Sequence, residues 1–232
     1  MSKISRFTGK VVTLAKNAVG GRGGSAAPQG GGGFADYAVV SLHCLRIYLE
    51  KSYREALDLL SEMPQILAKI GLDAADLPDH STLVKGFDRT KMAVWRVVLR
   101  LSAQLHEPSG HTAMDAMFFD RENASKHYCR RTNYRVQTLK TTALVDTASQ
   151  AVLDVHCTIR KRHDTQIGWQ LARRNAGELH SLAADKGYDW QRLRDKLREE
   201  DVRPLIKHRE FRPIDHAHNA RIDGSLWPES VI

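Results

Sequence analysis

The second half of the chain consists of short apolar segments whose order restricts the fold more than any other feature of the sequence. Three of them are rich in threonine, valine and aromatic residues and are separated by polar breaks, which is typical of strands joined by hairpins. A helix, a strand, a strongly charged helix and a last strand follow. The segments lie at 111–119, 134–147, 150–160, 163–174, 178–189, 189–201 and 202–208. This order predicts a mixed α/β domain.

The first half shows helical periodicity instead. Ser52 and Glu55 have the spacing of a capping box at the start of a helix, and Pro78 breaks the chain before a helix capped by Asp79 or Ser81. An earlier helix carries an apolar stripe, and a later one over 91–105 is expected to bury its apolar side. The stripe residues are Tyr37, Val40, Cys44, Leu45, Tyr48 and Leu49, and the buried set is Met92, Trp95, Leu99, Ser102 and Leu105. Residues 35–107 are therefore predicted to form an all-helical unit.

Glycine dominates the segment before this unit. Residues 20–33 hold eight of the 16 glycines, and no Gly-Lys-Ser/Thr sequence follows, so a flexible linker is favoured over a phosphate-binding loop. Lysine and arginine occur in residues 1–19 without any acid. We predict a basic, flexible arm and linker over residues 1–34.

The net charge of +8 and the pI near 9.5 favour a partner that carries phosphate, although an ordinary basic protein would have the same values. Cys44, Cys129 and Cys157 are far apart, which fits a reducing interior rather than a disulfide scaffold. There is no long apolar run and no signal-peptide core. The expected location is therefore cytoplasmic, without membrane contact.

Two aspartates stand out in the predicted sheet. Asp115 lies in the first strand and Asp185 follows the fourth, and these strands are neighbours in a sheet of ribonuclease H-like order. Two converging carboxylates suit Mg²⁺ (or Mn²⁺), although strand ends carry acids in many proteins. Asp120 is expected to pair with Arg121 or Arg130 in a structural role.

Several longer blocks resemble insertion-sequence transposases of the DDE class. They include AMDAMFFDRENASKHYCRR, LKTTALVDT, IRKRHDTQ, AADKGYDW and RPLIKHREFRPIDHAHNARID, and the resemblance covers residues 36–223. It implies a helical DNA-binding unit over 35–107 and a ribonuclease H-like catalytic domain over 108–223. It also implies that Asp115 and Asp185 are catalytic metal ligands. The implied partner is double-stranded DNA at the inverted-repeat ends of the element, bound by a nucleoid-associated homo-oligomer when the protein is intact.

The third acid of the family, a glutamate on a later helix, has no counterpart in this sequence. Residues 224–232 read GSLWPESVI and differ from the family pattern, which suggests a frameshift and an incomplete catalytic domain. Glu229 is a weak substitute, and Glu199 and Glu200 are expected on a solvated helix face. We therefore expect a truncated chain without catalysis.

Candidate DNA contacts fall into two groups. The turn and helix at 77–91 resemble a helix-turn-helix, although a polar face on a bundle helix would look the same. Basic runs near the predicted strands are candidates for phosphate contacts, and exposed turns are the alternative. The first group is Ser81, Thr82, Lys85 and Arg89, and the second is Arg130, Arg131, Arg160, Lys161 and Arg162.

Three histidines near the end, His208, His216 and His218, could form a zinc site, but without cysteines nearby we favour surface histidines. Two other functions stay open for the chain as a whole. It could be a repressor-like fragment that binds DNA without catalysis, or an unrelated metal-dependent phosphohydrolase.

Overall fold

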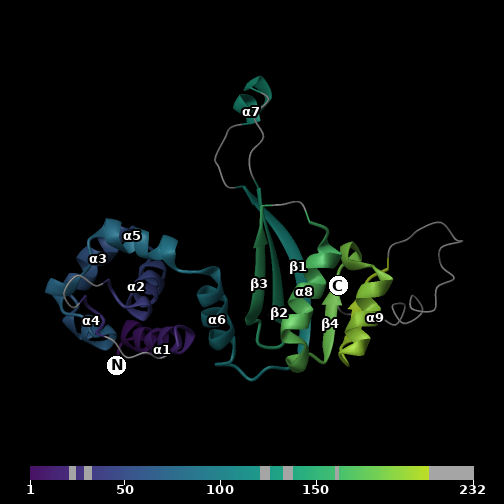
Figure 1. Cartoon of the computed structure of the whole chain (residues 1–232), viewed down its shortest axis with the longest axis horizontal. Helices are drawn as coiled ribbons and strands as arrows, with labels where there is room; N and C mark the ends of the chain where they lie inside the picture. Colours follow the sequence, from purple (N-terminus) through teal and green to yellow (C-terminus); the bar gives the residue numbers. More distant parts are fainter. Residues whose placement is uncertain (21–24, 29–32, 121–125, 133–137, 160–161, 209–232) are drawn as a thin grey trace, which may run out of the picture. The chain divides into compact units, whose positions relative to one another are not determined.

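The chain divides between Ser102 and Ala103 into a helical unit and a sheet unit, each with its own core. This computed structural model describes residues 1–20, 25–28, 33–120, 126–132, 138–159 and 162–208 (Figure 1). Among these residues, no helix combines the length and the apolar character that crossing a bilayer requires.

The helical unit is built from helices that pack around one apolar core. They are α1 (Lys3–Ala18), α2 (Asp36–Leu49), α3 (Tyr53–Ser61), α4 (Pro64–Ile70), a 3-10 turn η1 (Ala74–Asp76), α5 (His80–Arg89) and α6 (Met92–Ala103). The predicted capping box is confirmed, because the Ser52 hydroxyl accepts from the Glu55 amide at 3.3 Å and the Glu55 carboxylate accepts from the Ser52 amide at 3.1 Å. Helix α5 begins directly after Asp79.

The structure differs from the predicted flexible arm over most of its first half. Helix α1 begins after Ser2, whose hydroxyl accepts a hydrogen bond from the Ser5 amide, and it packs on α2 and α4. Thr8, Val11, Val12 and Ala15 are buried. The composition of residues 1–19 is basic, but its apolar residues recur every three or four positions. That stripe, rather than the charge, decides the conformation.

The prediction that the helix at 91–105 buries its apolar side is wrong for Met92 and Leu105, whereas Trp95, Leu99 and Ser102 are half-buried. Met92 is 51% exposed, and Leu105, which follows the end of α6, is also 51% exposed. Ala103 is the buried residue of α6. Apolar residues occur on more than one side of this helix, so periodicity alone does not identify the face that packs.

The sheet unit confirms the predicted α/β order. Its elements are β1 (His111–Asp120), α7 (Lys126–Thr132), β2 (Thr138–Asp146), β3 (Val152–Thr158), α8 (Asp164–Asn175), η2 (Ala176–Glu178), β4 (Ser181–Ala184), η3 (Lys186–Tyr188), α9 (Gln191–Glu199) and β5 (Arg203–Ile206). The strand order is β3-β2-β1-β4-β5; the first three strands are antiparallel, whereas β4 runs parallel to β1 and to β5. Helix α7 was not predicted.

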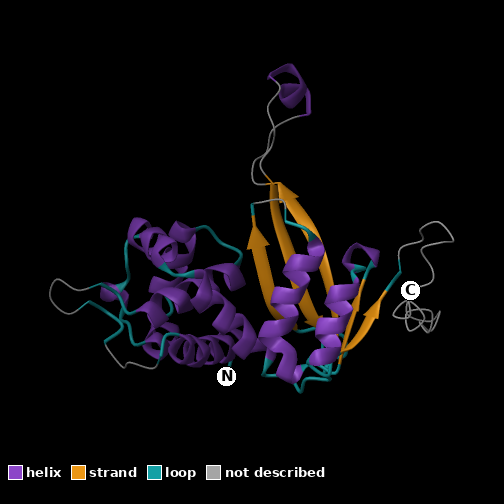
Figure 2. Cartoon of the chain, turned by 45° about the vertical axis from the view of Figure 1, so that its right-hand side comes forward, coloured by secondary structure: helices purple, strands orange, loops and turns teal. Residues whose placement is uncertain are grey.

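Helices α8 and α9 lie side by side against one face of the sheet (Figure 2). Close approach of α8 depends on Gly168, because a Cβ there would lie 2.9 Å from the Tyr188 ring and 3.3 Å from the Met114 sulfur. The core between these layers includes Met114, Leu144, Ile167, Leu171, Leu182, Leu193, Leu197 and Ile206. The covered face therefore supports the middle of β1 and the end of β4, where the candidate site lies.

Candidate active site

The register of β1 and β4 brings the two predicted aspartates to matching positions. The parallel pairing runs from His111 opposite Ser181 to Met114 opposite Ala184; Asp115 is the next residue of β1, and Asp185 directly follows β4. Residues at matching positions of neighbouring parallel strands point to the same face of a sheet. Both aspartates are exposed. The register therefore brings the two aspartates to adjacent positions of neighbouring segments, within reach of solvent.

Local hydrogen bonds fix one oxygen of each carboxylate. Asp115 Oδ1 accepts from the Ala116 amide at 2.7 Å, and Asp185 Oδ1 accepts from the Gly187 amide at 2.8 Å. Exposed carboxylate oxygens of this kind fit a hard divalent cation such as Mg²⁺.

A third carboxylate, from Asp164 at the start of α8, lies beside Asp185. A Cβ on Gly187 would be 2.9 Å from Asp185 Oδ1 and 3.6 Å from Asp164 Oδ2, so both oxygens border the same small space. Asp164 also forms an ion pair with Lys140 of β2. The sequence analysis missed Asp164, whose only signal was its place in the block IRKRHDTQ, directly after the third predicted strand.

The charges of these carboxylates act on Tyr188, in the short turn that follows Asp185. Tyr188 is 1% exposed, and its pKa is raised, first by burial and then by the negative charges of Asp164, Asp115 and Asp185. The Thr142 hydroxyl acts in the opposite direction and lowers this pKa. The charges of the three acids therefore all act on one buried side chain, that of Tyr188.

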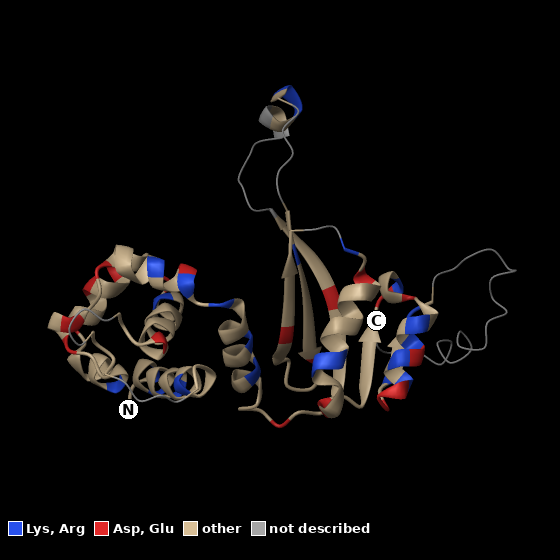
Figure 3. Cartoon of the chain, in the orientation of Figure 1, with Lys and Arg blue, Asp and Glu red and all other residues tan. Residues whose placement is uncertain are grey.

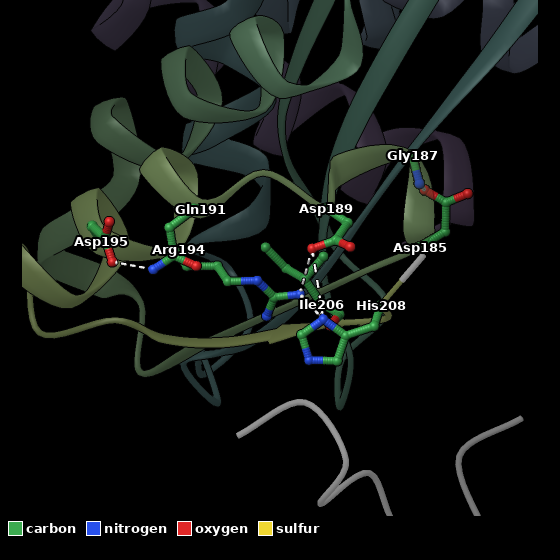
Figure 4. Close-up of polar contacts among 8 residues, drawn as sticks. All are labelled: Asp185, Gly187, Asp189, Gln191, Arg194, Asp195, Ile206 and His208. Atoms are coloured by element: carbon green, nitrogen blue, oxygen red, sulfur yellow. Dashed lines mark hydrogen bonds and ion pairs between the residues drawn. The ribbon is translucent and has the colours of Figure 1, made fainter. Parts of the chain in front are cut away.

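The loop after Asp185 is held in place by a buried arginine (Figure 4). Arg194 of α9 is 1% exposed, and its Nη2 donates to Asp189 Oδ1 and to the Ile206 carbonyl, each at 2.9 Å. The same nitrogen lies 3.2 Å from His208 Nδ1. His208 therefore takes part in this cluster, whereas His216 and His218 lie outside the described residues.

The predicted DNA contacts on α5 share an exposed side of that helix. Thr82, Lys85 and Arg89 are exposed and contribute to a surface hollow of about 400 Å³. Ser81 is half-buried, and its hydroxyl donates to Asp79 at 2.8 Å.

The remaining predicted positions are distributed around the sheet unit. Arg130 and Arg131 are exposed on α7, and Arg162 is exposed before α8. Arg160 and Lys161 lie outside the described residues, as do Glu229 and Arg121, the suggested partner of Asp120. Glu199 and Glu200 are exposed at the end of α9. No group of three His, Cys, Asp or Glu side chains within the described ranges is close enough to hold a metal ion.

Acidic and basic residues both occur on the helices of the sheet unit. Figure 3 shows acidic and basic residues along α8 and α9, with acidic residues also on the strands. Charge alone therefore does not mark one face of this unit as the nucleic-acid surface.

Comparison with known proteins identifies the family. Residues 106–223 match the family model described as the transposase DDE domain, and this match covers about half of the chain. Among solved structures, the chain is similar to the piggyBac transposase in a synaptic complex with hairpin DNA, with a TM-score of 0.41 and 8% sequence identity. That similarity covers 90% of this chain and 49% of the other, so the chain spans about half the length of the protein it matches. No curated protein matches it. The family match confirms the resemblance seen in the sequence, and the chain belongs to the transposase DDE domain family.

Proposed function

We propose that this chain acts on the DNA of an insertion-sequence element, at its inverted-repeat ends, by metal-dependent phosphodiester hydrolysis and strand transfer. The main support is the β1–β4 register, in which Asp115 and Asp185 follow the last paired residues of neighbouring strands. The proposed catalytic domain spans residues 108–223.

Asp115 and Asp185 are the proposed ligands of a divalent metal, Mg²⁺ or Mn²⁺. DDE transposases generally use such an ion, and the exposed carboxylate oxygens here suit it. When bound, the metal would activate a water or 3′-hydroxyl and stabilise the leaving oxygen. Tyr188 and the Arg194 cluster support the loop that carries Asp185, which keeps this residue at the end of β4, beside β1.

Double-stranded DNA is the proposed partner. The helical residues 35–107 would contact the element ends through the exposed side of α5, where Thr82, Lys85 and Arg89 lie. Arg130, Arg131, Arg160, Lys161 and Arg162 are proposed phosphate contacts. The net charge of +8 supports attraction to the DNA backbone. Pairing of two DNA ends would require a homo-oligomer.

DNA binding without catalysis, which the sequence led us to expect for this chain, is the second candidate. It is favoured by one observation, that the described residues contain no set of three His, Cys, Asp or Glu side chains close enough to hold a metal ion. A complete site of the family uses a third acid, so a chain that lacks one would bind the element ends and repress transposition.

The two candidates are separated by assays on DNA that carries the inverted repeats. The purified chain is tested for a gel shift and for strand cleavage, with and without Mg²⁺ or Mn²⁺. For a transposase we expect Asp115→Asn and Asp185→Asn to retain binding but to lower cleavage by ~10³-fold or more, because the lost carboxylates hold the metal. Asp195→Asn, an exposed change on α9, should leave cleavage unchanged.

Each other outcome points to a different function. A gel shift without cleavage under all metal conditions would favour the repressor-like fragment. Hydrolysis of small phosphate esters together with no affinity for DNA would overturn both candidates and indicate a phosphohydrolase.

A further inference from the structure

We propose that Asp164 is a positioning residue of the acidic site, held beside Asp185 by Lys140, and that its charge strengthens the binding of a divalent cation there. This inference rests on the proposed function of Asp115 and Asp185. It concerns a side chain outside the pair of aspartates that the sequence identified.

The Lys140 side chain is the buried anchor of this arrangement. Lys140 is 5% exposed, on β2 between Phe118 of β1 and Thr158 of β3. Its Nζ forms the ion pair with Asp164 and donates to the Arg162 carbonyl at 3.0 Å. A buried ammonium group needs such partners because desolvation of an isolated charge costs several kcal/mol, roughly. Lys140 therefore fixes the start of α8 to the sheet.

Asp164 presents its second oxygen to the site. Oδ1 takes part in the ion pair, whereas Oδ2 borders the space at Gly187 that Asp185 Oδ1 also borders. The Asp164 side chain is 31% exposed and that of Lys140 only 6%. A cation that approaches from solvent would therefore meet the carboxylate and not the ammonium group.

The charges at this position favour a cation. Asp115, Asp164 and Asp185 all act on the buried Tyr188, which is 1% exposed, and Lys140 is the lysine that the structure pairs with one of them. Like charges held close together repel one another, and a bound cation relieves that repulsion. Because no three such side chains in the described part of the chain are close enough to be joint ligands, Asp164 acts through its charge and through the position of Asp185.

A second ion pair on the same helix offers a matched control. Asp154 of β3 accepts from Arg174 Nε at 2.7 Å and from Asn175 Nδ2 at 3.2 Å, at the C-terminal end of α8. Both pairs fasten α8 to the sheet, but only the Lys140–Asp164 pair borders Asp185. A purely structural role would give the two pairs the same effect on metal binding.

The test measures Mn²⁺ affinity of the full chain by electron paramagnetic resonance of free Mn²⁺, after thermal melts have established the folded fraction of each variant. We expect Asp164→Asn to weaken Mn²⁺ binding about tenfold or more, as is usual for residues that support metal ligands. Asp154→Asn should lower the melting temperature and leave Mn²⁺ affinity unchanged. The double variant Lys140→Met with Asp164→Asn removes the buried ammonium group together with its carboxylate partner and should show the same loss of affinity if the single variant does not fold.

Asp185→Asn separates the inference from the proposed function. If this variant loses Mn²⁺ binding while Asp164→Asn and Asp154→Asn both keep it, the role of Asp164 is wrong and the metal site stands. If Asp185→Asn also keeps full affinity, the proposed metal site itself is wrong.

Discussion

The helical unit and the sheet unit differ in what they bury. In the described residues of the helical unit, the buried polar side chains are Thr8, Ser41 and His43. The sheet unit buries side chains that carry ionisable groups, among them Lys140, Asp146, Asp154 and Arg194. Helices satisfy their backbone groups internally, whereas the loops around a mixed sheet leave groups that must find partners. Apolar packing therefore stabilises the helical unit, whereas networks of buried polar side chains also hold the loops of the sheet unit in place.

Among the variants that test this difference between the units, Arg194→Met is expected to have the largest effect. The change leaves the buried Asp189 carboxylate without its guanidinium partner, which should cost ~3–5 kcal/mol of the free energy of unfolding of the sheet unit. Hydrogen exchange on the full chain would show faster exchange in β4, β5 and α9 and unchanged protection in α2 and α4.

Arg198→Met is the control for this prediction. Its ion pair with Asp195 at 3.5 Å is exposed, so the change should alter stability by less than ~1 kcal/mol. Equal losses in the two variants would show that burial of the charge is not the cause.

Asp146→Asn is expected to have the next largest effect. Asp146 is 0% exposed, and its carboxylate accepts hydrogen bonds from Ser109, Ala148 and Ser149 at 2.7–3.1 Å. An asparagine amide turns a donor toward some of these donors, so unfolding of the sheet unit should become easier by ~1–3 kcal/mol at neutral pH. Denaturant unfolding followed by circular dichroism would measure the loss.

The same variant should also change the response of the sheet unit to acid. Burial by itself raises the pKa of Asp146, but hydrogen bonds from Ser149 and Ser109 outweigh it and hold the pKa well below its ordinary value of 3.8. The unfolded chain therefore takes up the proton first, and the contribution of Asp146 is present above pH 3.8 and lost as the pH falls further. Asp146→Asn should remove this part of the acid dependence, and an unchanged acid profile would contradict it.

The sequence predicted the sheet unit better than the start of the helical unit, for a physical reason. Strand periodicity and the capping box at Ser52 depend on neighbouring residues, which a sequence shows directly. Helix α1 also carries a local pattern, its apolar stripe, but the prediction of a flexible arm gave more weight to the basic composition of residues 1–19. The exposed Met92 shows the opposite case, in which a local pattern was not enough to identify the packed face.

The candidate site was predictable in part. Asp115 and Asp185 could be related because the order of strands makes β1 and β4 neighbours. Asp164 could not, because its relation to Lys140 and Asp185 depends on how the start of α8 approaches β2 and the turn at Gly187. Such contacts join residues distant in sequence, and no local pattern encodes them.

The smallest expected effect concerns His43, on α2 of the helical unit. Its imidazole is 3% exposed, lies 3.1 Å from the Leu83 carbonyl and contacts the Trp95 ring. Burial is the largest influence on its pKa and lowers it below the ordinary 6.5; Arg46 also lowers it, while the Leu83 carbonyl and Asp88 raise it.

The unfolded chain therefore binds the proton of His43 at a higher pH than the folded chain does. The contribution of His43 to stability is present above pH 6.5 and is lost as the pH falls below it, by at most ~1.4 kcal/mol per pH unit for one group. Hydrogen exchange at pH 7 and pH 5.5, corrected for the intrinsic rates, should show reduced protection in α2 and α5 with little change in β1 and β2. His43→Leu should abolish this pH response, although it costs the Leu83 hydrogen bond. A loss of protection in both units over this range would show that the pH response does not come from His43.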